Sequence, residues 1–183
     1  TFIPTHSAID KVCDFNCDNE TINKLVEITL RSDESNFIYY PYDCPHREKN
    51  GWTADASLSA EQMLHTFDAY DSLKQWLLCI RKAQRRDGAL PGIIPTAGWG
   101  FQFGNGPAWD SVLIELPYQL YRFYGKDEII KENAEAIEKY FGYIKTRLNA
   151  DGLIEIGLGD WCQTYTSAEG DYETPVEITD SLT

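Results

Sequence analysis

Apolar residues recur every three or four positions in several stretches of the chain, which is the spacing of one face of an α-helix. In the first stretch, residues 20–32, Ile22, Leu25 and Ile28 follow this spacing, and Asn19 or Thr21 can serve as the N-cap. The same pattern predicts four more helices, at about residues 55–70, 71–86, 110–125 and 126–150. The chain is therefore expected to be mostly helical.

Glycine and proline mark the ends of these helices. Gly88, Gly125 and Gly152 each follow a periodic stretch, as residues just past a helix C-terminus often do. Pro117 lies inside one predicted helix and is expected to kink it. The longest helix should pack on the core through a stripe made of Ile130, Ala134, Ile137, Phe141 and Ile144.

The segments between the helices are of two kinds. Short turns at 68–71 and 125–127 pair consecutive helices, whereas residues 35–45, 90–109 and 153–175 are longer and rich in Gly, Pro and aromatic residues. No segment convincingly predicts a sheet. The pattern indicates an all-α fold of consecutive helical hairpins with long loops at one end, and a bundle, a solenoid or a toroid would all satisfy it.

Composition and charge exclude several kinds of partner. The chain has 183 residues, of which 43% are apolar and 13% aromatic, enough for one domain with a sizeable core. Its net charge of −13 argues against nucleic acid and anionic membranes as partners, because neither would be attracted to it. No stretch of about 18 apolar residues is present, so no membrane span is predicted.

The five cysteines do not form a complete disulfide framework, because their number is odd. Cys13 and Cys17 could begin a metal site or form a local bridge, but no second pair at ligand spacing follows. No metal or cofactor is therefore predicted. The chain begins at Thr1 without a visible signal peptide, so it is expected to be part of something longer. Residues 1–18 are expected to be an irregular entry segment, and the compartment is left open.

Carboxylates and tryptophans gather in the predicted loops. They are Asp43, Glu48, Asp55, Asp110 and Asp160, with Trp52, Trp109 and Trp161 close by. Cleavage of a glycosidic bond needs a proton donor at the leaving oxygen and a base or nucleophile on the opposite face, and carboxyl groups fill both roles. Further carboxylates bind sugar hydroxyls through charge-assisted hydrogen bonds, and aromatic rings cover the apolar faces of a sugar.

Each of these residues also has a structural interpretation. Asp43 suits an Asx turn before Pro45, and Glu48 suits a solvated surface position. Asp55 suits a helix N-cap or a first helical turn. The tryptophans could be core rings. Their recurrence beside carboxylates in three separate loops favours a functional role.

The sequence "DCPHREKNGWTADA", residues 43–56, resembles the signature of the bacterial α-L-rhamnosidases, a family of six-hairpin glycosidases. The usual form in that family is Asp-Cys-Pro-x-Arg-Glu, a short spacer and Gly-Trp-Thr-Gly-Asp-Ala. His46 stands where Gln is more usual and Ala54 where Gly is, and neither change removes a catalytic group.

Further matches follow in the family's order. They are "CIRKAQRRDGALPGIIP", "PAWDSVLIELPYQLYRFYG" and "GDWCQ", so that the resemblance extends from about residue 13 to the end. The usual spacer between Trp109 and Asp110 is missing here.

Carried over position by position, the resemblance implies that Glu48 is the general acid. It implies substrate-binding roles in the −1 subsite for Asp43, Arg47, Trp52, Asp55, Trp109, Asp110, Asp160 and Trp161. Asp43 and Asp55 would bind sugar hydroxyls, Arg47 would brace a carboxylate or a hydroxyl, and the tryptophans would line the pocket. Asp160 would order its loop.

The resemblance also implies an (α/α)6 toroid and an inverting mechanism, in which a second carboxylate activates water. A toroid needs twelve helices and this chain supplies five or six, so residues 1–183 are interpreted as the N-terminal half of a catalytic domain. None of the available acids Glu155, Glu169, Glu173 and Glu177 matches the family's base, which is expected beyond Thr183. The implied partners are a carbohydrate substrate and the rest of the same polypeptide, with accessory β domains.

Two other interpretations remain at this point. The chain could belong to another six-hairpin glycosidase, such as a trehalase-like or amylase-like enzyme with a different sugar specificity. It could also be a non-catalytic carbohydrate-binding protein of helical hairpins. The sugars that are cleaved discriminate the first alternative, and sugar binding without hydrolysis would indicate the second.

Overall fold

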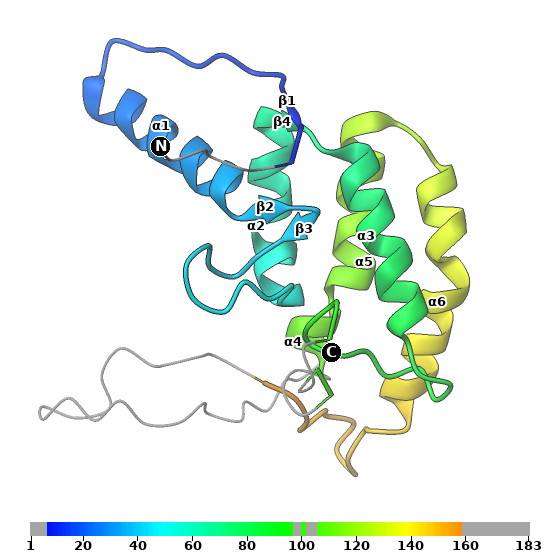
Figure 1. The fold of residues 1–183 in the computed structure, drawn as a ribbon. Helices are drawn as coiled ribbons and strands as arrows, with labels where there is room; N and C mark the ends of the chain where they lie inside the picture. Colours follow the sequence, from blue (N-terminus) through cyan, green and yellow to red (C-terminus); the bar gives the residue numbers. More distant parts are fainter. Residues whose placement is uncertain (1–6, 97–99, 102–105, 159–183) are drawn as a thin grey trace, which may run out of the picture.

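A computed structural model describes residues 7–96, 100–101 and 106–158, and within them helices dominate (Figure 1). The helices are α1 (Glu20–Ser35), α2 (Thr53–Thr66), α3 (Tyr70–Ala83), α4 (Pro107–Asp110), α5 (Val112–Tyr124) and α6 (Glu128–Lys145). The short strands are β1 (Asp10–Lys11), β2 (Phe37–Ile38), β3 (Tyr40–Pro41) and β4 (Phe67–Asp68). None of the helices described is both long and apolar enough to cross a membrane.

The five helices predicted from periodicity are present, with ends shifted by a few residues. The stretch predicted as one helix over residues 110–125 begins inside a separate short helix, α4, and α5 continues through Pro117. The strands are too short to show alternation in the sequence. Antiparallel β1 and β4 attach the entry segment to the connection between α2 and α3, and β2 and β3 form a small hairpin before the motif of residues 43–56.

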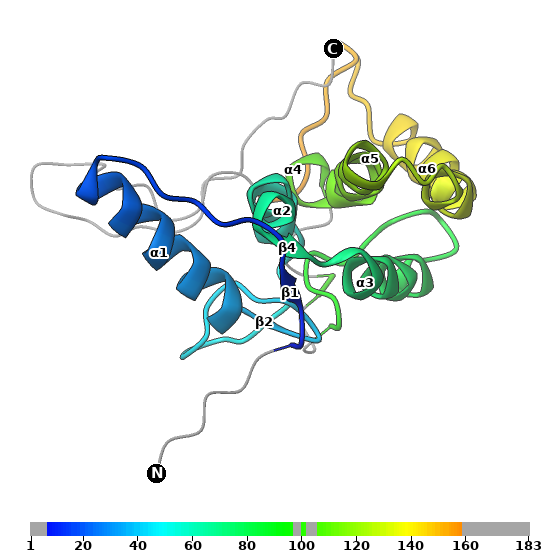
Figure 2. The same cartoon turned by 90° about the horizontal axis from the view of Figure 1, so that it is seen from above.

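The body of the molecule is built around α5, which packs against α2, α3 and α6, whereas α1 projects away on the other side of α2 (Figures 1 and 2). Leu113, Leu116 and Leu120 recur on one face of α5 and are fully buried. Each such side chain contributes roughly 1.5–3 kcal/mol through removal of apolar surface from water. Helix α1 buries none of its residues, and Leu25 on it is 54% exposed.

The predicted apolar stripe of the longest helix is partly wrong. Ile144 is buried, but Ala134 and Phe141 are exposed. The buried side of α6 consists of Ile129, Asn133, Ala136, Tyr140, Tyr143 and Ile144. The reason is that polar atoms on this side find partners: the Asn133 side chain donates to the Ile129 carbonyl at 2.6 Å and accepts from Arg81 at 2.8 Å.

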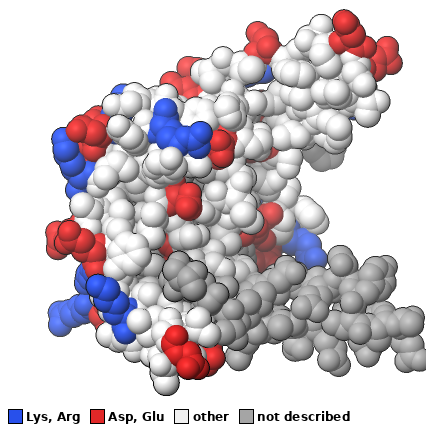
Figure 3. Space-filling model, turned by 180° about the vertical axis from the view of Figure 1, so that it is seen from behind, with Lys and Arg blue, Asp and Glu red and all other residues white. Residues whose placement is uncertain are grey.

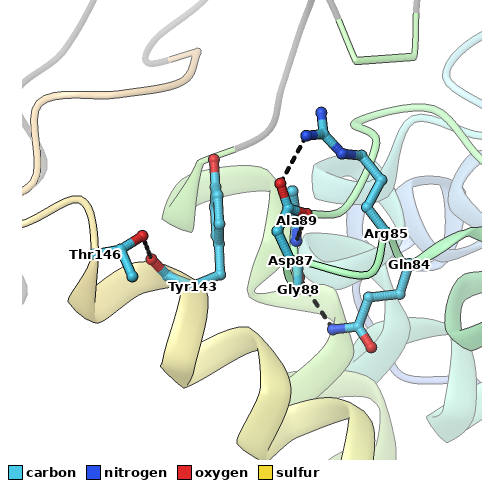
Figure 4. Close-up of polar contacts among 7 residues, drawn as sticks. All are labelled: Gln84, Arg85, Asp87, Gly88, Ala89, Tyr143 and Thr146. Carbon is cyan, nitrogen blue, oxygen red and sulfur yellow. Dashed lines mark hydrogen bonds and ion pairs between the residues drawn. The ribbon is translucent and has the colours of Figure 1, made fainter.

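The turn that follows α3 packs against the end of α6 (Figure 4). Arg85 pairs with Asp87 at 2.6 Å, and the Gln84 amide donates to the Gly88 carbonyl at 3.0 Å. Gly88 has a φ of +101°, and a Cβ there would lie 2.3 Å from the Lys139 carbonyl oxygen, so this position requires glycine. After the turn, residues 89–95 run alongside the motif of residues 43–56 and form backbone hydrogen bonds with Gly51 and Thr53.

Candidate active site

The motif of residues 43–56 forms a closed loop that leads into α2. The Asp43 N–H donates to the Asn50 carbonyl at 3.1 Å, and the Asn50 N–H donates to Asp43 Oδ1 at 2.9 Å. The Cys44 thiol donates to Asp43 Oδ2 at 2.9 Å. Asp43 therefore closes the base of the loop through Asn50, seven residues on, rather than through the local Asx turn before Pro45, and each of its oxygens keeps a further lone pair for a ligand.

Glu48 lies on the exposed part of this loop, where its main chain and its side chain are both held. Its N–H donates to the Cys44 sulfur at 3.3 Å. Its Oε2 accepts a hydrogen bond from Trp52 Nε1 at 2.8 Å. Arg47, the neighbouring residue, is exposed.

Trp52 is anchored by the segment that returns from the turn after α3. Trp52 pairs with Ile93 in an isolated antiparallel bridge. On either side, the Ile94 N–H donates to the Gly51 carbonyl at 2.8 Å and the Thr53 N–H donates to the Gly92 carbonyl at 2.9 Å. The Trp52 ring meets that of Trp109 edge to face, with centroids 6.3 Å apart. Two of the three predicted tryptophans therefore lie together.

Asp55 lies in the first turn of α2, close enough to the loop for the charges of the loop to affect its pKa. Asp55 is exposed, yet the protein atoms around its carboxyl desolvate it, and this desolvation is the main reason that its pKa is raised. The negative charges of Asp43 and Glu48 raise the pKa of Asp55 further. Asp55 therefore lies within the electrostatic influence of the other two carboxylates of the motif.

A recess of about 280 Å³ adjoins two of these carboxylates. Asp43 and Asp55 form one wall, and the other lining residues are Ser32, Asp33, Asn36, Phe37, Pro41, Tyr42, Leu58, Ser59 and Met63. Seen from behind, the surface is hollowed beside the projecting α1, and charged side chains lie at the inner edge of this hollow (Figure 3). The recess combines polar groups with an apolar floor, as sites for small ligands do.

Sequence reasoning missed the wall that α1 contributes. Burial raises the pKa of Asp33, and the Gln62 amide donates to its Oδ2 at 2.7 Å. The Asn36 side-chain oxygen is buried and has no partner among the described residues. Neither residue belongs to the motif, and no local pattern in α1 signals that its C-terminal end reaches the recess.

Known proteins match almost the whole chain in sequence and in fold. The model of the bacterial alpha-L-rhamnosidase 6 hairpin glycosidase domain matches residues 10–182. This chain belongs to that family. The resemblance seen in the sequence is confirmed, and so is the fold class: helical hairpins that form part of a six-hairpin (α/α)6 domain.

Among family members, an alpha-L-rhamnosidase from Alteromonas sp. is 30% identical over 166 residues, which are 90% of this chain and 18% of that protein. One from Streptomyces avermitilis is 29% identical over 160 residues, 85% of this chain and 15% of that protein. The chain spans between 15% and 18% of the length of the curated rhamnosidases that it matches.

Solved rhamnosidase structures superpose well on the chain. The alpha-L-rhamnosidase of Dictyoglumus thermophilum has a TM-score of 0.81 at 34% identity, over 88% of this chain and 18% of that one. The Streptomyces avermitilis enzyme complexed with L-rhamnose has a TM-score of 0.80 at 25% identity, over 91% of this chain and 16% of that one.

Three of the predicted site residues lie outside the motif of residues 43–56: Asp110, Asp160 and Trp161. Asp110 is completely buried at the end of α4, and its carboxyl is next to the Tyr140 hydroxyl of α6. The substrate-binding role predicted for Asp110 stays a prediction. Asp160 and Trp161 lie outside the described residues, so their predicted roles remain predictions.

Asp110 should make the stability of the rhamnosidase fold depend on pH. Burial raises the pKa of Asp110 well above its ordinary value, and the nearby Tyr140 hydroxyl opposes this only in part. The folded state then keeps a proton that the unfolded state loses, so stability falls as the pH rises above about 4. In Asp110→Asn this loss should be absent. The melting temperature of the variant minus that of the wild type should therefore increase steadily from about pH 4 to about pH 8.

Thermal unfolding at several pH values tests this expectation. The matched control is Asp151→Asn, which makes the same change at an exposed position and should follow the wild type. A difference between Asp110→Asn and the wild type that stays constant with pH would show that Asp110 is ionised in the folded protein.

Proposed function

We propose that the protein containing this chain is an α-L-rhamnosidase that removes terminal α-L-rhamnosyl residues from oligosaccharides, polysaccharides or glycosides. The observation that carries the proposal is the grouping of three carboxylates, from Asp43, Glu48 and Asp55, with Trp52 in one motif, where Trp52 contacts Glu48 and the other two carboxylates line a recess. Family membership supports the choice of sugar, since the matched relatives are named alpha-L-rhamnosidases.

In this proposal Glu48 donates a proton to the departing glycosidic oxygen. Its exposed position on the loop suits a group that must reach the bond between the sugar and its leaving group. Because Oε2 accepts from the Trp52 indole, Oε1 is the oxygen that carries the transferred proton. Proton donation of this kind matters most when the leaving group is a poor one.

Asp43 and Asp55 bind hydroxyls of the rhamnosyl ring in the −1 subsite. Carboxylates accept hydrogen bonds from hydroxyls, and a charged acceptor makes such bonds stronger. Arg47 braces a carboxylate or a hydroxyl from the loop. Trp109 covers part of the sugar, and its buried indole N–H has no partner among the described residues, which leaves a donor for a ligand.

A second carboxylate activates the attacking water, and the reaction proceeds with inversion. The two carboxyl groups of an inverting glycosidase lie roughly 6.5–9.5 Å apart. We place the base in a part of the polypeptide outside this chain, which the greater length of the relatives supports. Glu155 is a poor candidate, because it does not match the position of the family's base in the sequence. The isolated chain should therefore turn over little or no substrate.

The raised pKa of Asp55 predicts how sugar binding depends on pH. Ionised Asp55 is the better acceptor, so inhibition by free L-rhamnose should weaken as the pH falls through a value above the ordinary 3.8. Asp55→Asn should remove this dependence and weaken binding about tenfold or more, the loss expected for a charged hydrogen bond. Inhibition constants measured across the acidic range check both points.

The control for that measurement is Asp71→Asn, which changes the equivalent acid in the first turn of α3. It should bind L-rhamnose as the wild type does at every pH. If Asp55→Asn keeps both the affinity and the pH dependence of the wild type, Asp55 does not bind the sugar.

The proposed activity is tested with the full-length protein and a panel of p-nitrophenyl glycosides. We expect release of p-nitrophenol from the α-L-rhamnoside and none at a comparable rate from the other sugars. Preference for a different sugar would show that the protein is a six-hairpin glycosidase with another sugar specificity. Sugar binding without cleavage of any glycoside would contradict an enzymatic function.

A further inference from the structure

The indole of Trp52 is placed differently from the pocket-lining ring that the family resemblance implies, and closer to the core ring that was the alternative interpretation. A ring that lines a sugar pocket must offer a face to the ligand, but Trp52 is only 8% exposed and its N–H points to Glu48. We propose that Trp52 is a positioning residue, which fixes the carboxyl of the general acid through its indole N–H. This inference rests on the role proposed above for Glu48.

The hydrogen bond has the geometry needed for such a role. The distance from Trp52 Nε1 to Glu48 Oε2 is 2.8 Å, which lies in the usual range for an N–H that donates to a carboxyl oxygen. An indole can only donate, and its two side-chain torsions leave it few alternative positions. Glu48 by itself has a longer, flexible side chain on an exposed loop, so the indole removes freedom that the acid would otherwise have.

The donor is itself held rigidly. The backbone around Trp52 is fixed on both sides by hydrogen bonds to residues 92–94, and its ring packs against that of Trp109. The segment beneath is anchored in turn, because the Trp76 indole donates to the Ile94 carbonyl at 2.8 Å. The position of Glu48 Oε2 is thus tied through Trp52 to the buried core below α2 and α3.

Loss of a group that only positions the acid should slow the reaction only for substrates whose leaving group needs a proton from that acid. A dinitrophenolate leaves without protonation, whereas the alkoxide of a sugar needs a proton in the transition state. Loss of the indole N–H should therefore slow cleavage of a rhamnosyl disaccharide and spare a 2,4-dinitrophenyl rhamnoside. A ring that binds the sugar would affect both substrates alike, because both carry the same rhamnosyl group.

The test compares Trp52→Phe with the wild type in the full-length protein. We expect kcat for the disaccharide to fall by roughly 10- to 100-fold, part of the 10²–10⁴ that general acid catalysis supplies. For the dinitrophenyl rhamnoside kcat should stay within about threefold, and KM for both substrates should change little. Equal losses on both substrates, or a change confined to KM, would overturn the inference.

Two further variants keep the result interpretable. Trp76→Phe removes an indole N–H from a buried ring that anchors the segment beneath Trp52, so any selective loss of rate on the disaccharide should be smaller than that caused by Trp52→Phe. If Trp52→Phe fails to fold, benzothienylalanine placed at position 52 retains the ring shape without the N–H and decides the question in the same assay. A wild-type protein that cleaves no rhamnoside would instead contradict the proposed function.

Discussion

Replacing Glu48 by Gln in the full-length protein is expected to lower kcat for an α-L-rhamnosyl disaccharide by about 10²–10⁴-fold, the contribution of a general acid. Gln has nearly the same shape and can still accept the hydrogen bond from Trp52, which is 2.8 Å long in the native chain. It cannot donate a proton to a leaving oxygen and recover it. Steady-state kinetics on the disaccharide measure the loss, and KM should change much less than kcat.

The matched control is Glu155→Gln, which makes the same chemical change at an exposed carboxylate paired with Asn149. Its kcat should stay within about twofold of the wild type, as expected for a surface substitution outside the site. A Glu48→Gln protein that retained most of its rate on the disaccharide would show that another group is the acid.

Replacing Gly51 by Ala should disrupt the base of the site. A Cβ at this position would lie 2.0 Å from the Ile94 carbonyl oxygen and 2.9 Å from its carbon, and both are backbone atoms that cannot rotate away. The contact between residues 51 and 94 must therefore open. We expect a loss of roughly 3 kcal/mol or more in the free energy of unfolding, at the upper end for overpacking, together with reduced kcat.

Gly142→Ala is the control for this change. Gly142 lies within α6, and a Cβ there would meet nothing within 4 Å. The same substitution should stabilise the protein by about 0.5–1 kcal/mol, because alanine favours the helix. Thermal unfolding and disaccharide kinetics compare the two variants, and a Gly51→Ala protein as stable and active as Gly142→Ala would contradict the packing described between these segments.

Helices were predictable from the sequence where apolar spacing alone determines them. The stripe on α6 was misread because the side that is buried includes Asn133 and two tyrosines, whose polar atoms give no apolar signal. The pairing of β1 with β4 was not predictable, because two-residue strands show no period. The apolar residues of α1 fit a helix, yet none of them is buried among the described residues.

The site was predictable as far as it is contiguous in the sequence. Residues 43–56 contain Glu48, which we propose as the acid, together with Asp43, Asp55 and Trp52, so one motif predicts all four. Other parts of the site come from outside the motif, and only the fold brings them there. They are residues 92–94, whose backbone hydrogen bonds hold Gly51 and Thr53, and the recess wall formed by Asp33 and Asn36. Asp110 is next to Trp109 in sequence, but the end of α4 turns its carboxyl into the core.

The central claim is that this motif holds the rhamnosyl group and directs a proton to its glycosidic oxygen. The most direct test is a crystal structure of the full-length Glu48→Gln protein with an uncleaved α-L-rhamnosyl disaccharide. We expect sugar hydroxyls within hydrogen-bonding distance of Asp43 and Asp55, and the glycosidic oxygen roughly 2.6–3.2 Å from the Gln side chain at position 48. A disaccharide bound with its glycosidic oxygen beyond reach of residue 48 would contradict the account.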